Sequence, residues 1–302
     1  MMNRLAKVLG LMSLVAAMLV ASMATVLAAE NVDWNSNVIR ATGGGVAPAG
    51  ARTMAQARMM ARRAAIADAY RQLAEYVGGV NVDSETTVNM AAVQSDVIRT
   101  KVKATIRGAR IVSEGQTSDG GYEVTMEVPM FGVSSLASAV IDRPAVREAF
   151  PQQVPNVLPA PVKPHDGGGW ITPETSTASG HGSSAATAPD GKAIGSFTGL
   201  IVDCRGLGLK PVMSPVIKNV NGSPIYGYKN LDYDKVIENG MASYAKDMSG
   251  AKRAGSNPLI VRAVDVENHG GTPVLSVADA NRILIENGAT HFLDNTRVVF
   301  LR

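Results

Sequence analysis

The strongest candidates for a catalytic role are the residues Asp203-Cys204-Arg205-Gly206. They directly follow an apolar stretch that predicts a buried strand. Strand ends in α/β folds often host active sites, and a cysteine nucleophile needs a histidine base within hydrogen-bond distance. His269 and His291 are available in the same part of the chain. Cys204 has no recognised flanking motif, however, and a lone strand cysteine is usually a small buried apolar residue. We therefore expect no catalytic role for it.

The carboxylates and the remaining histidines give no firmer site. Four acids near the C-terminus could pair as in a hydrolase, but their spacing does not demand it, and helix caps or solvated faces explain them equally well. These acids are Asp265, Glu267, Asp279 and Glu286. His165 and His181 lie in a Pro/Gly-rich stretch without other metal ligands nearby. We expect solvated histidines there and no metal site.

Two surface features invite binding hypotheses. Tyr226 and Tyr228 lie on a predicted hairpin and could stack on a sugar, although cross-strand packing is the more common role of such tyrosines. Basic residues on one helix could meet anionic lipid or cell-wall polymer, although their stems commonly pack around a helix that covers a sheet. These residues are Arg58, Arg62, Arg63 and Arg71.

The glycine run Gly43-Gly44-Gly45 lacks the spacing of a phosphate-binding loop or a dinucleotide fingerprint. Such a run at a strand end more often marks a bulge or a close approach of another backbone. We therefore assign no catalytic, cofactor-binding or metal-binding residue, and we expect no cofactor and no enzymatic activity.

The N-terminus has the pattern of a secretory signal peptide over residues 1–28, with cleavage after Ala28 or Ala29. Its apolar run is also long enough for a retained membrane anchor. The leader carries two of the 29 basic residues, so the mature chain balances 27 bases against 26 acids. This balance does not favour nucleic acid as a partner. Cys204 is the single cysteine, which excludes an intramolecular disulfide and a lipid-bearing cysteine next to the leader.

The element that organises the first domain, residues 36–150, is a predicted helix over 53–77. Apolar residues recur there every three or four positions, Thr53 can cap its start, and Gly78-Gly79 can end it. A strand over 37–46, a second helical or mixed segment over 91–106 and strands over 109–114 and 122–129 complete the pattern. The segment over 91–106 carries an apolar face of Val93, Val97, Ile98, Val102 and Ile106. This order predicts an α+β domain with helices on one side of an antiparallel sheet.

Residues 151–196 hold seven of the 15 prolines together with seven glycines, which predicts a flexible linker. A second small domain over 197–302, an α/β or α+β unit, shows strands at 198–203, 258–266 and 296–301 and a hairpin signal at Asn221-Gly222. Helices are expected over 232–248 and from Ser276 to Gly288. We expect this domain, too, to pack its helices on one side of a largely antiparallel sheet.

Two stretches of the first domain resemble a known family: ARRAAIADAYRQLAEYVGG, and DVIRTKVKATIRGARIVSE followed by YEVTMEVPM. They are similar to the small envelope lipoprotein family (Lpp type, twenty-kilodalton class) and to the N-terminal domain of flagellar assembly protein T. The second domain resembles domains of uncharacterised exported bacterial proteins. The resemblance implies a helix-on-sheet module of the bacterial envelope without catalytic residues.

We therefore expect an exported, non-enzymatic assembly or interaction module in the periplasm or at the cell surface, with a possible link to the flagellum. Its partner would be an envelope protein or a second copy of the chain. The alternative is a periplasmic module that binds a cell-wall glycan or another small ligand. The sequence leaves membrane contact open.

Overall fold

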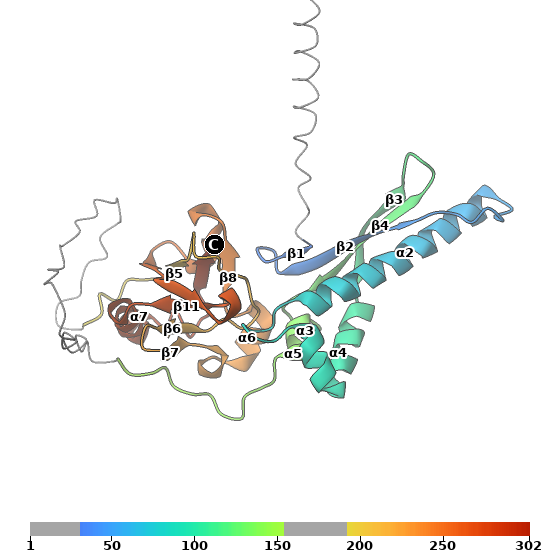
Figure 1. The fold of residues 1–302 in the computed structure, drawn as a ribbon. Coiled ribbons are helices and arrows are strands. Elements are labelled where there is room, and N and C mark those ends of the chain that lie inside the picture. The colour runs from blue at the N-terminus through green and yellow to red at the C-terminus, as the bar shows by residue number, and fades with distance from the viewer. Residues whose placement is uncertain (1–30, 154–191) are drawn as a thin grey trace, which may run out of the picture. The chain divides into compact units, whose positions relative to one another are not determined.

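The computed structural model describes residues 31–153 and 192–302 (Figure 1). The predicted signal peptide, most of the predicted linker, and His165 and His181 lie outside the described residues. The described residues from Val32 onward form one compact unit, in which the first region packs helices on an antiparallel sheet and the second contains a parallel and a mixed sheet. No helix in the described ranges combines the length and apolar character needed to cross a bilayer.

The first region is organised by the long helix that the sequence predicts. Its sheet has the order β1-β2-β4-β3, and every pairing in it is antiparallel. In Figure 1, α2 lies along β2 and β4. The elements are β1 (Val32–Asp33), β2 (Val38–Gly45), α2 (Met54–Gly79), α3 (Val88–Gln94), α4 (Asp96–Arg107), β3 (Arg110–Gln116), β4 (Tyr122–Pro129) and α5 (Leu136–Val140). The expected α+β arrangement of this region is confirmed.

Small residues bring α2 unusually close to β2. Ala61, Ala65 and Ala69 recur every four residues on the buried side of the helix, and two glycines of β2 lie beneath them. A Cβ placed on Gly43 would lie 2.2 Å from the amide nitrogen of Ala69, and one on Gly45 would lie 2.2 Å from the carbonyl oxygen of Ala61. The glycine run therefore permits a close approach of backbones, as its sequence position suggested.

Helix α2 begins at the predicted Thr53 cap, but it ends two residues later than predicted. The Thr53 hydroxyl accepts a hydrogen bond from the Gln56 amide at 3.1 Å, while the Gln56 side chain accepts one from the Arg52 amide at 2.9 Å. The helix runs through Gly78 and Gly79 and ends at Val80, so the glycines form its last turn and do not stop it. Gly78 is buried against the Asn89 side chain, where a Cβ would lie 2.5 Å away. Packing between α2 and α3 thus explains this glycine.

The expected segment over 91–106 is two helices. Ser95 ends α3 and caps α4, because its hydroxyl accepts a hydrogen bond from the Ile98 amide at 3.3 Å. Val102 is buried, whereas Val93 and Val97 at the corner between the helices are exposed. The apolar face suggested by the sequence is therefore divided at Ser95.

A buried carboxylate ties three strands of the first sheet together. Glu127 on β4 is 3% exposed and bonds to Arg40 on β2 at 2.8 Å and to Arg110 on β3 at 2.6 Å. Burial alone would raise the pKa of Glu127, but the hydrogen bonds from Arg110 and Arg40 outweigh it and hold the pKa below its usual value.

The depressed pKa of Glu127 predicts acid sensitivity. A carboxylate that ionises more readily when folded stabilises the protein above its unfolded pKa, near 4.3, and this stability is lost as the pH falls through the folded pKa. Glu127→Gln should lower the free energy of unfolding by about 1–2 kcal/mol at pH 7 and flatten its decline between about pH 5 and pH 3. Urea titrations across this range test it. Glu123→Gln, at an exposed position on the same face of β4, is the matched control, and equal pH profiles for the two variants would contradict the prediction.

The second region differs from the expected antiparallel fold. Its elements are β5 (Gly199–Asp203), β6 (Ile217–Asn219), β7 (Pro224–Tyr226), η2 (Tyr228–Asn230), α6 (Tyr233–Asn239), β8 (Ser243–Ala245), η3 (Met248–Gly250), η4 (Lys252–Ala254), β9 (Pro258–Arg262), β10 (Asp265–Glu267), η5 (Asn268–Gly270), β11 (Thr272–Leu275), α7 (Val277–Thr290) and β12 (Val298–Leu301). The sheet β8-β12-β5-β9 is parallel throughout. The sheet β10-β11-β6-β7 is mixed, with one parallel pair between β11 and β6.

The expectation of a largely antiparallel sheet was therefore wrong for the second region. The physical reason lies in β5 and β12, which are continuously apolar. Strands of a parallel sheet are covered on both faces, so they lack the alternation of apolar and polar residues that marks a half-exposed antiparallel strand. The hairpin at Asn221-Gly222 is confirmed by the pairing of β6 with β7.

Two helix ends in this region also differ from expectation. The helix expected over 232–248 ends at Asn239, since Gly240 takes a φ of 72° and the chain continues as strand β8 beside β12. Helix α7 starts at the Ser276 cap as expected, but it passes through Gly288 and ends at His291, whose φ is 54°. Gly240 fits its left-handed position without the strain that a side chain would bring.

Candidate functional site

Cys204 lies in the core rather than in a reactive setting. Its side chain is fully buried, and its backbone amide donates to the Leu301 carbonyl at 2.9 Å. Burial raises the pKa of the Cys204 thiol to about 12, and the nearby charge of Asp203 adds to the shift. No hydrogen bond joins Cys204 to His269 or His291 in the described ranges. The thiol therefore stays protonated at neutral pH, while a cysteine nucleophile must be a thiolate.

The accessibility of this thiol can be measured directly. In the folded protein at pH 8, Cys204 should react with a thiol reagent at least about 100-fold more slowly than a small free thiol, because the sulfur is buried and protonated. In 6 M guanidinium, it should react completely, which serves as the internal control. Rapid labelling of the native protein would restore Cys204 as a candidate nucleophile.

The remaining acid candidates have separate structural partners. Asp279 belongs to the N-terminal cap of α7, where the Ser276 hydroxyl contacts its carboxylate at 2.7 Å. Glu267 faces Lys218 at 3.9 Å, and Asp265 accepts a hydrogen bond from the adjacent Val266 amide. Across the described residues, no group of three or more His, Cys, Asp or Glu side chains is arranged to hold a metal ion.

Glu286 differs from the solvated acid that the sequence suggested, because it is fully buried on α7. Its carboxylate accepts hydrogen bonds from the amides of Ile194 and Gly195 at 2.8 and 2.9 Å. Arg282 approaches the same carboxylate at 2.8 Å. This arrangement fixes residues 194–195 against α7 and gives each carboxylate oxygen of Glu286 a polar partner.

Of the two tyrosines, Tyr226 lacks the exposure that sugar stacking requires. Tyr226 is fully buried, donates to the Met241 carbonyl at 2.7 Å and stacks on Phe150 with ring centroids 6.5 Å apart. Tyr228 is half-buried in η2. The packing role is therefore confirmed for Tyr226.

Two of the four basic residues of α2 form ion pairs, and two do not. Arg62 bonds to Glu114 on β3, and Arg71 bonds to Asp68 and Glu75 on its own helix. Arg58 and Arg63 are exposed and make no ion pair within the described residues. The α2 arginines therefore do not form one continuous unpaired cationic face.

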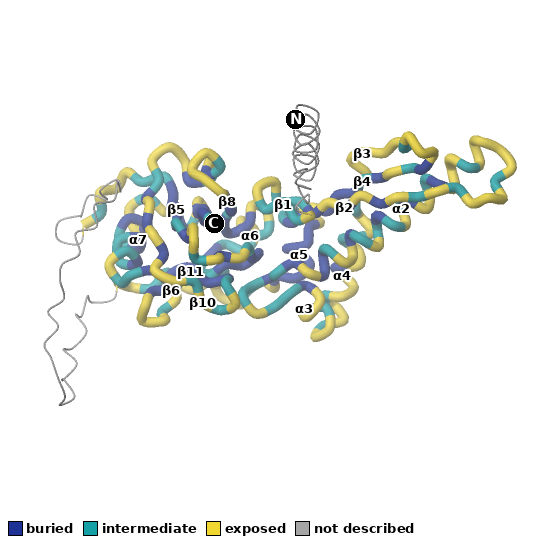
Figure 2. Tube along the Cα trace, turned by 45° about the horizontal axis from the view of Figure 1, so that its top comes forward, coloured by how far each residue is buried: buried dark blue, intermediate teal, exposed yellow. Residues whose placement is uncertain are grey.

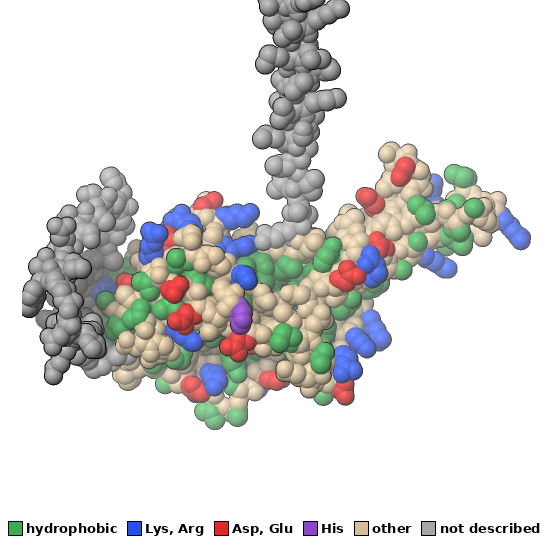
Figure 3. All heavy atoms as spheres, in the orientation of Figure 1, with side chains coloured by type: hydrophobic (Ala, Val, Ile, Leu, Met, Phe, Trp, Pro, Cys, Tyr) green, Lys and Arg blue, Asp and Glu red, His purple; other side chains and the backbone are tan. Residues whose placement is uncertain are grey.

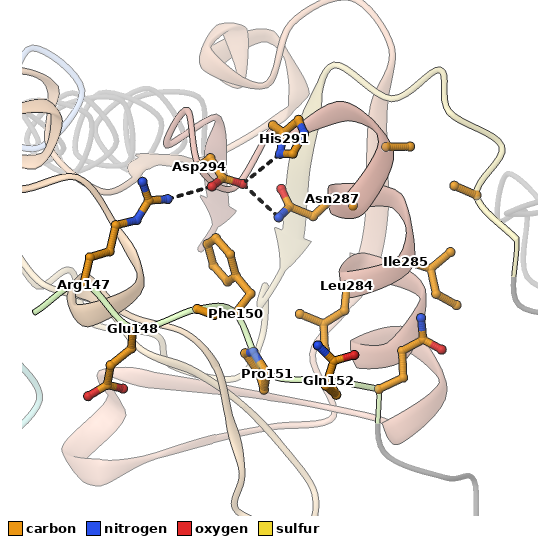
Figure 4. Close-up of a pocket in the computed structure, with 15 residues that line it drawn as sticks. Arg147, Glu148, Phe150, Pro151, Gln152, Leu284, Ile285, Asn287, His291 and Asp294 are labelled. Carbon is orange, nitrogen blue, oxygen red and sulfur yellow. Dashed lines mark hydrogen bonds and ion pairs between the residues drawn. The ribbon is translucent and has the colours of Figure 1, made fainter.

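A groove of about 810 Å³ lies between α7 and residues 147–153 (Figure 4). Its apolar wall includes Phe150, Leu284 and Ile285, and its polar end holds three side chains around Asp294. Asp294 accepts hydrogen bonds from Arg147 at 2.7 Å and from Asn287 at 3.0 Å, and His291 Nδ1 lies 3.5 Å away. The groove thus combines an apolar wall with a compact charged cluster.

The hydrogen bonds around this cluster also attach residues 147–150 to the second region. The Arg147 side chain donates to the Asn230 carbonyl at 2.8 Å, and the Glu148 amide donates to the Lys229 carbonyl at 2.9 Å. The Asn230 amide group donates to the Ala149 carbonyl at 3.0 Å. Asp294 therefore helps to hold residues 147–150 against the second region. A small molecule or a short peptide could lie along the apolar wall of the groove.

Sequence reasoning found only one residue of this groove, His291, and paired it with Cys204, which lies in the core. Asn287, His291 and Asp294 are close in sequence at the end of a helix, so their spacing could have suggested a polar cluster. Arg147 lies 147 residues from Asp294, and no local pattern connects them.

Each of the two regions matches a known family model. Residues 45–129, which include α2 to β4, match the family model described as LPP20 lipoprotein. The chain carries an LPP20 lipoprotein domain. Residues 199–302, from β5 to β12, match the model described as the second domain of Treponema pallidum Tp0624. No curated protein matches the chain.

The LPP20 domain confirms the family resemblance of the first region and supports an exported, envelope-associated protein. In this chain, the single cysteine lies outside the LPP20 domain and is buried, so it cannot carry a lipid in the folded protein.

Proposed function

We propose that this chain is an exported, non-enzymatic assembly module of the bacterial envelope that binds a protein partner or a second copy of itself. The LPP20 match supports the envelope setting. The observation that carries the interaction role is the open edge of the LPP20 sheet at β3. A periplasmic position, a surface position and a flagellar link all fit this proposal.

All seven residues of β3 are exposed, and the strand forms the outer edge of its sheet (Figure 2). Ile111 and Val112 present apolar side chains that are 39% and 45% exposed. A free strand edge offers unpaired backbone donors and acceptors to an incoming strand. A bulge between Ile111 and Ser113 interrupts the register, which limits pairing to a partner that matches it. This edge suits recognition by β-strand addition.

Site-specific crosslinking in the envelope tests the proposal. A photoreactive residue at Val112 should give a discrete adduct, and mass spectrometry of the adduct would identify a partner protein or a second copy. Val220 in the second region is 55% exposed and provides the control position. Absence of an adduct from β3, together with a strictly monomeric protein, would overturn the proposal.

The groove beside α7 supports a second candidate, a binding module for a cell-wall glycan or small ligand. Its volume and mixed lining resemble those of small-molecule sites in general. A thermal-shift screen with peptidoglycan fragments should then give a saturable rise in melting temperature. Ile285→Trp, which fills the groove, should abolish the rise. A screen without any saturable shift would set this candidate aside.

A further inference from the structure

The corner between α3 and α4 exposes apolar side chains that a folded domain ordinarily covers. Val93 in the last turn of α3 is 79% exposed, and Val97 in the first turn of α4 is 63% exposed. Met90, one turn earlier on α3, is 48% exposed. Ser95 separates the helices, and the Arg99 side chain bonds to the Ala92 carbonyl at 3.2 Å, so the corner is held in shape. The exposed valines therefore occupy a fixed projection.

Cations without carboxylate partners continue this surface along α4. Lys101, Lys103 and Arg107 are exposed and make no ion pair with any described residue, whereas Arg99 is paired with Asp96 at 2.7 Å. Figure 3 shows basic side chains gathered over this helix. Lys101 follows Val97 by one helical turn, so an apolar and a basic residue share one face.

A groove of about 730 Å³ extends the same surface toward α5. Lys101 and Ala104 line one side, and Ser134 and Val133 line the other. Val133 is 92% exposed, which adds a third prominent valine. At the groove's end, Arg110 and Glu127 neutralise one another, so Lys101 remains its unpaired charge.

We propose that this surface, defined by Val93, Val97, Val133, Lys101, Lys103 and Arg107, docks the protein on an anionic phospholipid bilayer. Apolar side chains flanked by lysine and arginine are the pattern that lies at a bilayer interface, where the apolar groups enter the acyl boundary and the cations meet the headgroups. A protein partner or a neutral glycan would not require an unpaired cationic set of this kind. The docking is reversible and needs no attached lipid, in keeping with the buried position of the single cysteine.

Vesicle co-sedimentation tests the proposal with residues 32–302, a range that excludes the apolar leader and contains one compact unit. Binding to vesicles with 30% phosphatidylglycerol should exceed binding to pure phosphatidylcholine by at least about tenfold, because each cation near an anionic surface contributes roughly fivefold. Lys101→Glu/Lys103→Glu should reduce the partition coefficient by more than about tenfold. Lys246→Glu/Lys252→Glu makes the same charge change at exposed positions in the second region and should retain more of the binding.

The valines distinguish a membrane from other anionic surfaces. Val93→Ser/Val97→Ser should lower binding to the anionic vesicles by about fivefold or more, because insertion contributes to partition, while Val220→Ser/Val264→Ser should leave it unchanged. If the α3–α4 valine variant binds as well as the wild type, attraction is purely electrostatic, and the membrane proposal fails in favour of an anionic polymer. Equal binding to the two kinds of vesicle would also overturn it. Circular dichroism should show that all four variants are folded, since every substituted residue is exposed.

Discussion

Gly43→Ala is expected to destabilise the LPP20 domain by about 2–3 kcal/mol, although it adds a single methyl group. The new Cβ would lie 2.2 Å from the Ala69 amide nitrogen and 2.3 Å from the Ala65 carbonyl oxygen. Both neighbours are backbone atoms of a long helix, so neither can rotate away as a flexible side chain can. Relief requires α2 to move off β2, which would open the packing around Leu73 and Val77.

The adjacent glycine provides the control. A Cβ on Gly44 meets no atom within 4 Å, because this residue faces the opposite side of the sheet. Gly44→Ala should therefore be neutral or stabilise by up to about 1 kcal/mol through a less flexible unfolded chain. Urea unfolding followed by circular dichroism at 222 nm compares the variants. Equal midpoints for Gly43→Ala and Gly44→Ala would show that α2 does not pack on β2 at this distance.

The pairing of alanines with glycines illustrates what the sequence could predict. A row of alanines at helical spacing predicts a thin helix face, and a glycine run at a strand end predicts a close neighbour. Their partnership follows once both are assigned to one small domain. The hairpin of β3 and β4 was predictable for a similar reason, because alternating strands flank the turn residues Asp119-Gly120-Gly121.

In the second region, local sequence patterns do not predict which strands pair. Strand β8 has only three residues, and it exists because β12 offers it a parallel edge. The local sequence there continues a helical pattern, so tertiary pairing overrides propensity. Likewise, parallel pairing of β5 with β12 joins residues about a hundred positions apart, and no turn signal marks it.

The candidate sites were harder to predict from the sequence than the fold. Both the groove around Asp294 and the projection at Val93 and Val97 depend on how separate segments meet. The sequence placed Val93 and Val97 on an apolar helix face, which ordinarily predicts burial. Their exposure results from the break at Ser95, which turns the first part of that face away from the core.

Arg253→Ala is expected to cost the second region about 3–4 kcal/mol. The guanidinium donates to the Thr296 carbonyl at 2.6 Å, the Asn239 carbonyl at 2.8 Å and the Gly240 carbonyl at 2.5 Å, and also to the Thr296 hydroxyl at 2.8 Å. Burial lowers the pKa of Arg253, but an arginine remains charged at neutral pH. Its loss would leave several carbonyl groups without a donor in a partly buried position.

The location of these carbonyls explains why the expected effect is large. Gly240 has a φ of 72° and Thr296 a φ of 53°, so Arg253 stabilises two left-handed turns, one before β8 and one before β12. For Thr296, this backbone costs about 1–3 kcal/mol and persists only when its surroundings enforce it. Without Arg253, both turns can change conformation. The starts of β8 and β12 are then no longer held in place for parallel pairing.

Two further variants separate this role from a general effect of removing charge. Arg253→Lys should recover less than half of the lost stability, because one ammonium group cannot reach carbonyls on two turns as the planar fork does. Lys252→Ala, at the exposed neighbouring position, should change stability by no more than about 0.5 kcal/mol. Thermal and urea unfolding give the comparison. If Arg253→Ala unfolds at the same midpoint as Lys252→Ala, the two turns hold their conformation without the guanidinium, and the stability of the parallel sheet must then come from the buried faces of β5 and β12 alone.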